Sequence, residues 1–419
     1  MTGSASLAAA RRHDPYAALR VRPFRWFIGS VLTMTVATQI QTVVVGWQIY
    51  AVTRDPLSLG LVGLAEALPF VGIALFAGHV ADRMSRRRVV LLALTALLGC
   101  SAALLGFTLY PPVLAGGRVW PIYAVVFVSG VARSFLQPAR QAFGAELVPR
   151  ELYPNAVAWR SSTWQLASVV GPAAGGLLYG FSGAPTAYAV DAMLMALSLG
   201  ALVPARSARI VPPSAGGSML ESLATAIRFL RSRRVILAAL TLDLFSVLFG
   251  GATALLPVFA SDILRVGPEG LGVLRAAPSA GAVLMALVLA HRPPFRRAGR
   301  ALLVNVALFG LAMIGFGLSR SFPLSTALLA LSGAVDMVSV VIRSTLLQVL
   351  TPEPLLGRVS SVNQIFVGSS NEIGAFESGV AARLMGTVPS VVFGGAVTLV
   401  VVALTAWRVP ELRRLREIR

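Results

Sequence analysis

The stretch GHVADRMSRRR, residues 78–88, closes one long apolar run, 58–81, and leads into the next, 88–110. About 20 apolar residues in a helix span the hydrocarbon core of a bilayer, and lipid excludes open sheet edges. Both runs are therefore predicted to be transmembrane helices. The arginine-rich stretch between them is then a short loop at one surface of the membrane.

Apolar runs of this length recur along the whole chain. Its 419 residues are 56% hydrophobic and only 13% charged, whereas about a quarter of the residues of a soluble domain are charged. The predicted fold class is an all-α integral membrane protein with about twelve transmembrane helices. The predicted helices are 26–51, 58–81, 88–110, 120–143, 158–182, 186–203, 234–261, 268–291, 300–318, 322–346, 358–385 and 388–408.

The basic residues, all of them arginine, give a formal charge of +19. They cluster before the first predicted helix, after the second, in the middle of the chain, after the eighth and at the C-terminal end. This alternation follows the positive-inside rule and argues against a nucleic-acid partner. Both termini are predicted to be cytoplasmic. Because the arginine-rich start lacks an apolar core, no cleavable signal peptide is expected.

The two halves of the chain align with each other. Residues 66–69, EALP, match 275–278, RAAP, at an offset of 209, and residues 129–176 match 332–379 at an offset of 203. The identities are few, and chance apolar similarity is the alternative. The ungapped register of glycine, proline and charged positions favours a common origin, which predicts two pseudo-symmetric six-helix bundles.

The repeat also predicts the domain organisation. We expect an N-terminal six-helix bundle at 1–203, a cytoplasmic linker at 204–233 and a C-terminal six-helix bundle at 234–419. The linker ends in MLESLATAIRFLRSRR, where leucine and isoleucine recur at helical spacing opposite arginine. This pattern predicts an amphipathic helix lying on the cytoplasmic leaflet. A short solvated helix is the alternative.

The stretch 78–88 resembles the loop signature of the major facilitator superfamily of transporters. The motif residues are Gly78, Asp82, Arg83, Arg86 and Arg87. The resemblance implies the major facilitator fold and a gating loop, in which the glycine lets helices approach and the aspartate meets an arginine and a helix N-terminus. A plain positive-inside loop would explain the arginines but not Gly78 or Asp82. Ser85 replaces the second glycine of the signature, so a slightly rearranged loop is expected.

The stretch GPAAGG, residues 171–176, resembles the core of the antiporter signature of the same superfamily. Its motif residues are Gly171, Pro172, Gly175 and Gly176. Proline removes a backbone hydrogen bond and small residues let helices touch, so close packing and a kink are implied. Ala158 and Ala167 stand where the signature has glycine. Antiport and a purely structural kink therefore both remain open.

A third match indicates one branch of the superfamily. Residues 137–142, QPARQA, with 147–156 and 347–359, resemble the branch of enterobactin exporters and macrolide-efflux proteins. This resemblance covers essentially the whole chain. It implies efflux of a siderophore or an amphiphilic drug.

Ionisable residues occur near the middle of several predicted helices. They are Glu66, Arg133, Asp243, Arg275, Asp336 and Glu372. Facing lipid, each would cost about 2.5–3.5 kcal/mol and the set about 15–20 kcal/mol, more than the stability of a typical fold. They are therefore predicted to line a cavity or to pair with each other, as a relay for charge or protons. Static pairing between helices is the alternative.

The repeat inverts the sign of charge at two of these positions. Glu66 corresponds to Arg275, and Arg133 corresponds to Asp336. An acid and a base at related positions could face each other across a central cavity, paired in one access state and parted in the other. Proton coupling needs an acid whose protonation changes in the physiological range. Glu66 is the first candidate, followed by Asp336 and Glu372.

Polar and aromatic side chains could line the same cavity for an amphiphilic cargo. The predicted substrate-cavity residues are Gln39, Trp47, Gln48, Trp164, Gln165, Asn363, Asn371 and Glu377. Each of them is equally well explained as a polar contact between helices.

The composition excludes other sources of energy and chemistry. Three histidines and Cys100 do not supply a metal site, and no cofactor is expected. Because the chain has no lysine and no phosphate-binding loop, ATP-driven transport is excluded. The sequence shows no combination of a nucleophile and a base that would suggest an enzyme.

The prediction is a monomeric, proton-coupled exporter of a small amphiphilic molecule that works by alternating access in the inner membrane. Its expected partners are a small-molecule substrate, protons and the lipid bilayer. An importer or uniporter of the same fold is the nearest alternative. A non-transporting membrane sensor or scaffold is the alternative from a different class.

Overall fold

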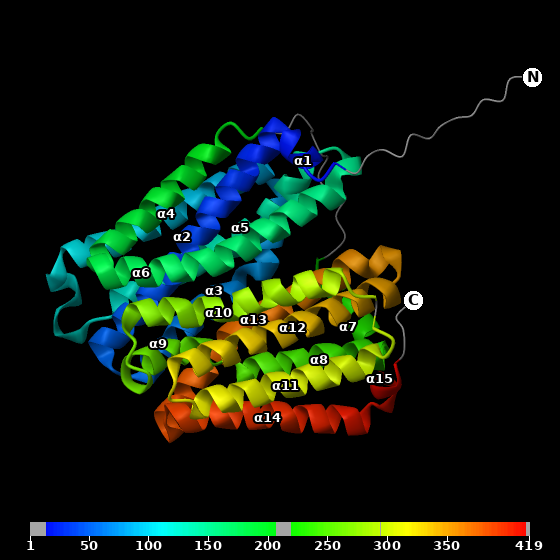
Figure 1. Cartoon of the computed structure of the whole chain (residues 1–419). Helices are drawn as coiled ribbons and strands as arrows, with labels where there is room; N and C mark the ends of the chain where they lie inside the picture. The colour runs from blue at the N-terminus through cyan, green and yellow to red at the C-terminus, as the bar shows by residue number, and fades with distance from the viewer. Residues whose placement is uncertain (1–13, 207–218, 294, 416–419) are drawn as a thin grey trace, which may run out of the picture.

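The computed structural model describes residues 14–206, 219–293 and 295–415, which form two bundles of helices (Figure 1). The N-terminal half consists of α1 (Ala17–Arg20), α2 (Arg22–Thr53), α3 (Pro56–Arg83), α4 (Arg86–Leu109), α5 (Trp120–Glu146) and α6 (Tyr153–Leu202). The C-terminal half consists of α7 (Met219–Ser232), α8 (Arg234–Gly250), α9 (Leu256–Val258), α10 (Gly267–Ala290), α11 (Ala298–Leu318), α12 (Phe322–Leu350), α13 (Glu353–Met385), α14 (Thr387–Arg408) and α15 (Pro410–Arg414).

The helices follow the predicted apolar runs in order and position. Within the described residues, nine helices are long and apolar enough to cross a membrane. One of them, α6, covers two predicted runs, because Gly183 interrupts it with φ 76° and ψ 176°. The predicted all-α membrane fold class is confirmed.

The helix predicted over 234–261 is interrupted. It ends at Gly250, and Gly251 has φ −84° and ψ 88°. The chain continues through a 3-10 turn at Ala252–Leu255, then α9, then a π-helical turn at Phe259–Ile263. Two consecutive glycines disfavour helix by about 1 kcal/mol each relative to alanine. The interruption leaves the last carbonyls of α8 without donors from the next helical turn.

Part of the predicted linker helix, α7, packs against the C-terminal bundle. Ala226 and Leu230 are buried against apolar side chains of α8, α12 and α13. This part of its apolar face therefore contacts protein rather than the lipid surface, because the three helices together present an apolar surface beside it. The side chains of Leu220 and Leu223 lie outside the described residues.

The two halves meet at one side of the molecule. We call the side that carries α1, α7 and α15 the terminal side, and the side that carries Thr53–Pro56, Gly183 and Gly267 the distal side. Figure 1 shows the halves converging toward the distal side and diverging toward the terminal side.

Glycines allow the backbones of the two halves to touch at the distal side. A Cβ atom at Gly379 of α13 would lie 2.6 Å from the Cα of Gly60 in α3. A Cβ atom at Gly176 of α6 would lie 2.7 Å from the Cα of Gly272 in α10. No side chain fits between backbones this close, so both contacts require glycine.

Candidate functional site

A cavity of about 330 Å³ lies between the two halves. It is bounded by α2, α3 and α5 on one side, and by α10, α13 and the α8–α9 connection on the other. Its polar wall residues are Thr38, Gln39, Gln41, Thr42, Glu66, Ser129, Arg133, Thr253, Arg275, Asn371 and Glu372. We call it the central cavity.

Glu66 and Arg133 form an ion pair in the wall of the central cavity. The close approach of α3 and α5 sets this pair, because a Cβ atom at Gly130 would lie 2.7 Å from Cγ of Pro69 and 3.2 Å from the carbonyl oxygen of Glu66. Arg133 lies about one helical turn after Gly130 and so reaches Glu66. The two side chains remain 20% and 25% exposed, so solvent and cargo can reach them.

The opposite half places a second acid and a second base on this cavity. Arg275 of α10 and Glu372 of α13 line it, and Arg275 interacts electrostatically with both Glu66 and Glu372. Two acids and two arginines thus share one cavity. Glu66 has its ion pair with Arg133 of its own half, whereas the repeat suggested Arg275 as the facing partner.

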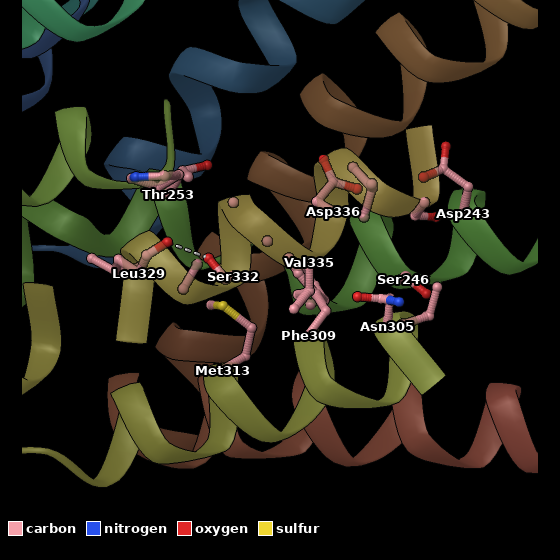
Figure 2. Close-up of a pocket in the computed structure, with 18 of the residues that line it drawn as sticks. Asp243, Ser246, Thr253, Asn305, Phe309, Met313, Leu329, Ser332, Val335 and Asp336 are labelled. Carbon is pink, nitrogen blue, oxygen red and sulfur yellow. Dashed lines mark hydrogen bonds between the residues drawn. The ribbon is translucent and has the colours of Figure 1, made fainter. Parts of the chain in front are cut away.

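Asp336 does not face Arg133 in this state. It lines a second cavity of about 260 Å³ inside the C-terminal half, with Asp243 (Figure 2). We call this the C-terminal cavity. Asp243 forms an ion pair with Arg343, and these side chains are only 9% and 8% exposed. The predicted charges therefore divide into a central group of four and a C-terminal group.

The predicted substrate-cavity residues also divide. Of these, Gln39 and Asn371 line the central cavity. Gln48 is buried within the N-terminal half, where it accepts a hydrogen bond of 2.8 Å from the hydroxyl of Tyr188. The remaining predicted residues are absent from the described cavity walls; they are Trp47, Trp164, Gln165, Asn363 and Glu377.

The predicted gating loop is described only in part. Arg86 forms an ion pair of 2.7 Å with Glu146, which joins the start of α4 to the end of α5. Arg87 donates to the carbonyl oxygens of Val203 and Ala205, at 2.7 and 3.0 Å. Both arginines therefore tie helix ends together on the terminal side. The motif residues Gly78, Asp82 and Arg83 lie in α3, and their side chains are outside the described set.

The GPAAGG stretch packs α6 against α2 of its own half and against α10 of the other half. A Cβ atom at Gly171 would lie 2.5 Å from Cβ of Gln39, and one at Gly175 would lie 3.0 Å from Cα of Ile40. Gly176 faces Gly272 of the other half, and the carbonyl oxygen of Pro172 lies against the same glycine. The stretch therefore places Gln39 at the cavity and holds the two halves together.

The sequence reasoning missed Asp191. It lies in α6, is fully buried, and accepts a hydrogen bond of 3.4 Å from Nε2 of Gln41. The signal was present, because an aspartate inside the apolar run 186–203 meets the same criterion as Glu66. Arg343 is not among the predicted charges, although it lies in the predicted helix 322–346, and the prediction did not include its pairing with Asp243.

Ion pairs on the distal side join the two halves. Arg54 donates to Asp262 at 3.1 Å and to Ser261 at 2.8 Å, and Tyr50 donates to Asp262 at 2.5 Å. A second pair joins Asp55 to Arg383 of α13. We call these residues the distal ion-pair cluster. No three histidine, cysteine, aspartate or glutamate side chains gather as in a metal site within the described chain.

The buried pair and the exposed pair predict losses of stability of different size when the aspartate of each is replaced by asparagine. Asp243→Asn leaves Arg343 buried without a counter-ion, and we expect it to lower the free energy of unfolding by about 3–5 kcal/mol. Asp262→Asn removes the acid of a pair whose side chains are 45% and 62% exposed, and a loss below about 1 kcal/mol is expected. Denaturation of the purified proteins in detergent measures both. Equal losses would contradict the assignment of the first pair as the buried one.

The chain is similar in sequence to known proteins. A family model described as "Transmembrane secretion effector" matches residues 13–417. The enterobactin exporter EntS of Citrobacter koseri is 31% identical over 377 residues, which are 88% of this chain and 88% of that protein. The enterobactin exporter EntS of Shigella boydii serotype 18 is 30% identical over the same shares.

Solved structures share the fold. A bacterial homolog of the human lysosomal transporter Spinster, in an inward-facing and unoccupied conformation, matches with a TM-score of 0.70 and 15% identity, covering 94% of this chain and 98% of that one. A D-xylose–proton symporter matches with a TM-score of 0.68 and 14% identity, covering 94% and 99%. At these identities the likeness concerns the fold alone.

Proposed function

The chain belongs to the transmembrane secretion effector family of major facilitator transporters, and we propose that it exports a small amphiphilic molecule in exchange for protons. It is a multi-pass membrane protein and a secondary transporter, and it is not an enzyme. The cargo class that we propose is a siderophore or an amphiphilic drug. The relatives named as enterobactin exporters support the direction and the siderophore.

The observation that carries this proposal is the set of four charges around the central cavity. Glu66 pairs with Arg133, and Arg275 and Glu372 face them from the other half. A proton on Glu66 removes its attraction for both arginines. An anionic or strongly polar group of a cargo that binds the arginines also displaces Glu66. Proton and cargo then compete for the same pair, which is the coupling that exchange requires.

Alternating access follows from how the halves meet. They touch through glycines at the distal side and diverge toward the terminal side. By the arginine distribution we propose that the terminal side faces the cytoplasm and that the membrane is the inner membrane. Cargo would then enter from the cytoplasm, and opening of the distal contacts would release it outside. We propose a monomer as the working unit, because one chain encloses the whole cavity.

Export can be measured directly in cells. We expect expression in an efflux-deficient host to lower the accumulation of at least one member of a panel of siderophores, macrolides and cationic drugs by several-fold. Collapse of the proton gradient should abolish the difference, because no ATP-binding loop is present. A host with the empty vector is the control. Increased uptake across the panel would contradict export, and an effect insensitive to the gradient would contradict coupling to protons.

A further inference from the structure

The C-terminal cavity is a compartment that the exchange of cargo and protons at Glu66 does not use. Figure 2 shows its lining from α8, α11 and α12, with Asp243, Phe309 and Asp336 among the labelled side chains. Thr253 and Asn371 belong to the walls of both cavities, so the C-terminal cavity adjoins the central one at these residues. Thr253 and Asn371 are therefore the residues at which the two cavities neighbour each other.

The charge of this cavity is negative. Asp243 is neutralised by Arg343, which pairs with it in the same bundle. Asp336 has no ion-pair partner among the described residues, and the described wall contains no arginine or histidine. One uncompensated carboxylate in a chamber of low polarity attracts a cation strongly, because little water screens it.

The end of α8 forms part of the same wall. Val247, Gly250 and Gly251 line the cavity, and α8 ends at Gly250. The carbonyl oxygens of Leu248 and Phe249 at this end of α8 lie against Gly374 of α13 and Gly394 of α14. Neutral oxygen acceptors are also present at Ser246 and Asn305.

The wall also carries an apolar patch beside its neutral polar residues, and this patch bears on the kind of cation that fits. Phe309, Met313, Leu329 and Val335 line the cavity, and Met313, Leu329 and Val335 are buried. A small metal ion is held by oxygen ligands alone and gains nothing from this apolar patch. An organic ammonium group can bind the carboxylate while its hydrocarbon part contacts these side chains, and Phe309 is an aromatic residue in the same wall.

We propose that the C-terminal cavity binds the ammonium group of a small amphiphilic amine, with Asp336 as its counter-ion. The volume of about 260 Å³ accommodates a single aromatic ring with a short aminoalkyl chain. As a second binding site for a cargo of this transporter, the cavity rests on the proposed export function. Cation binding itself does not rest on it, and is measurable without transport.

The test compares two ligands of nearly the same shape. The purified full-length protein in detergent is titrated with 2-phenylethylammonium and, separately, with the neutral 2-phenylethanol, by calorimetry. We expect the cation to bind at least about tenfold more tightly, as for other charge-assisted hydrogen bonds. Asp336→Asn should abolish this preference, and Asp336→Glu should retain most of it. Asp14→Asn, in an exposed ion pair with Arg20, is the control and should bind as the unchanged protein does.

A second variant keeps the proposal testable if the Asp336→Asn protein does not fold. Ser332→Leu narrows the cavity and leaves the acid in place, so it should weaken the binding of both ligands by several-fold. Equal affinity for cation and alcohol in the unchanged protein would overturn the proposal. So would a preference that survives Asp336→Asn, or sodium binding that depends on Asp336 without any preference for the organic cation. If the binding results are as expected but no export is seen in cells, the proposed export function is wrong and the cation-binding site still stands.

Discussion

Proteoliposomes that contain the Glu66→Gln protein are expected to lose proton-coupled transport down to the level of protein-free liposomes. Glutamine still accepts a hydrogen bond from Arg133, but it has no charge to offer the arginine and no proton to release. The competition between proton and cargo for this pair is then absent. The measurement is cargo accumulation driven by an imposed pH gradient, with the exported molecule found in the cellular panel.

The same substitution should leave the fold intact. Glu66 and Arg133 are a fifth to a quarter exposed in the cavity wall, so the unpaired arginine is solvated rather than sealed in apolar surroundings. We expect the melting temperature in detergent to change by only a few degrees, in line with a loss of about 1 kcal/mol. Glu353→Gln is the matched control, because Glu353 is an exposed acid in the first turn of α13. Gradient-driven transport by Glu66→Gln at the normal rate would refute the role of this acid.

Gly176→Ala is expected to open the distal side. The added Cβ atom would lie 2.5 Å from the carbonyl oxygen of Pro268 and 2.7 Å from Cα of Gly272. Both neighbours are backbone atoms, so the relief must come from separation of α6 and α10. Overpacking of this kind costs about 1–3 kcal/mol, which shifts the ratio of closed to open molecules by roughly 5- to 150-fold. Transport should fall by about tenfold or more, because the step of the cycle that closes the distal side is disfavoured.

The shift is measurable as a distance between the two halves. Spin labels at Arg118→Cys and Arg320→Cys, both exposed on the distal side, report it in a Cys100→Ser background. We expect the distribution to move to longer distances in Gly176→Ala. Gly200→Ala is the matched control on the same helix, since a Cβ atom there meets no other atom within 4 Å. An unchanged distribution in Gly176→Ala would contradict the closing role of this contact.

These two predictions depend on different kinds of sequence signal. Glu66 was identifiable from sequence, because a carboxylate inside an apolar run is costly wherever it points. Gly176 was identifiable as part of a resemblance, but its partner Gly272 was not. Which helices touch depends on their rotation about their own axes and on the way the halves meet. Hydropathy does not report either of these.

The cavity-lining residues show the same limit. Gln39 and Gln48 both lie in α2, and both looked equally suited to a polar cavity. Only Gln39 reaches the central cavity, whereas Gln48 is committed to Tyr188 inside the N-terminal bundle. Nine residues correspond to two and a half helical turns, so the two side chains point to nearly opposite faces. The helical period was available from sequence, but the face that meets the cavity was not.

The sequence by itself determined the membrane-spanning helices, because burial in lipid is a local requirement that each apolar run meets on its own. The GHVADRMSRRR stretch therefore located two helices and the loop between them without any tertiary information. Only the tertiary structure decided how the charges are partnered. Glu66 meets Arg133 because Gly130 brings α5 against α3, and Arg343 pairs with Asp243 of α8 rather than with Asp336 of its own helix. Such pairings depend on contacts between residues far apart in the chain, and spacing along one helix does not encode them.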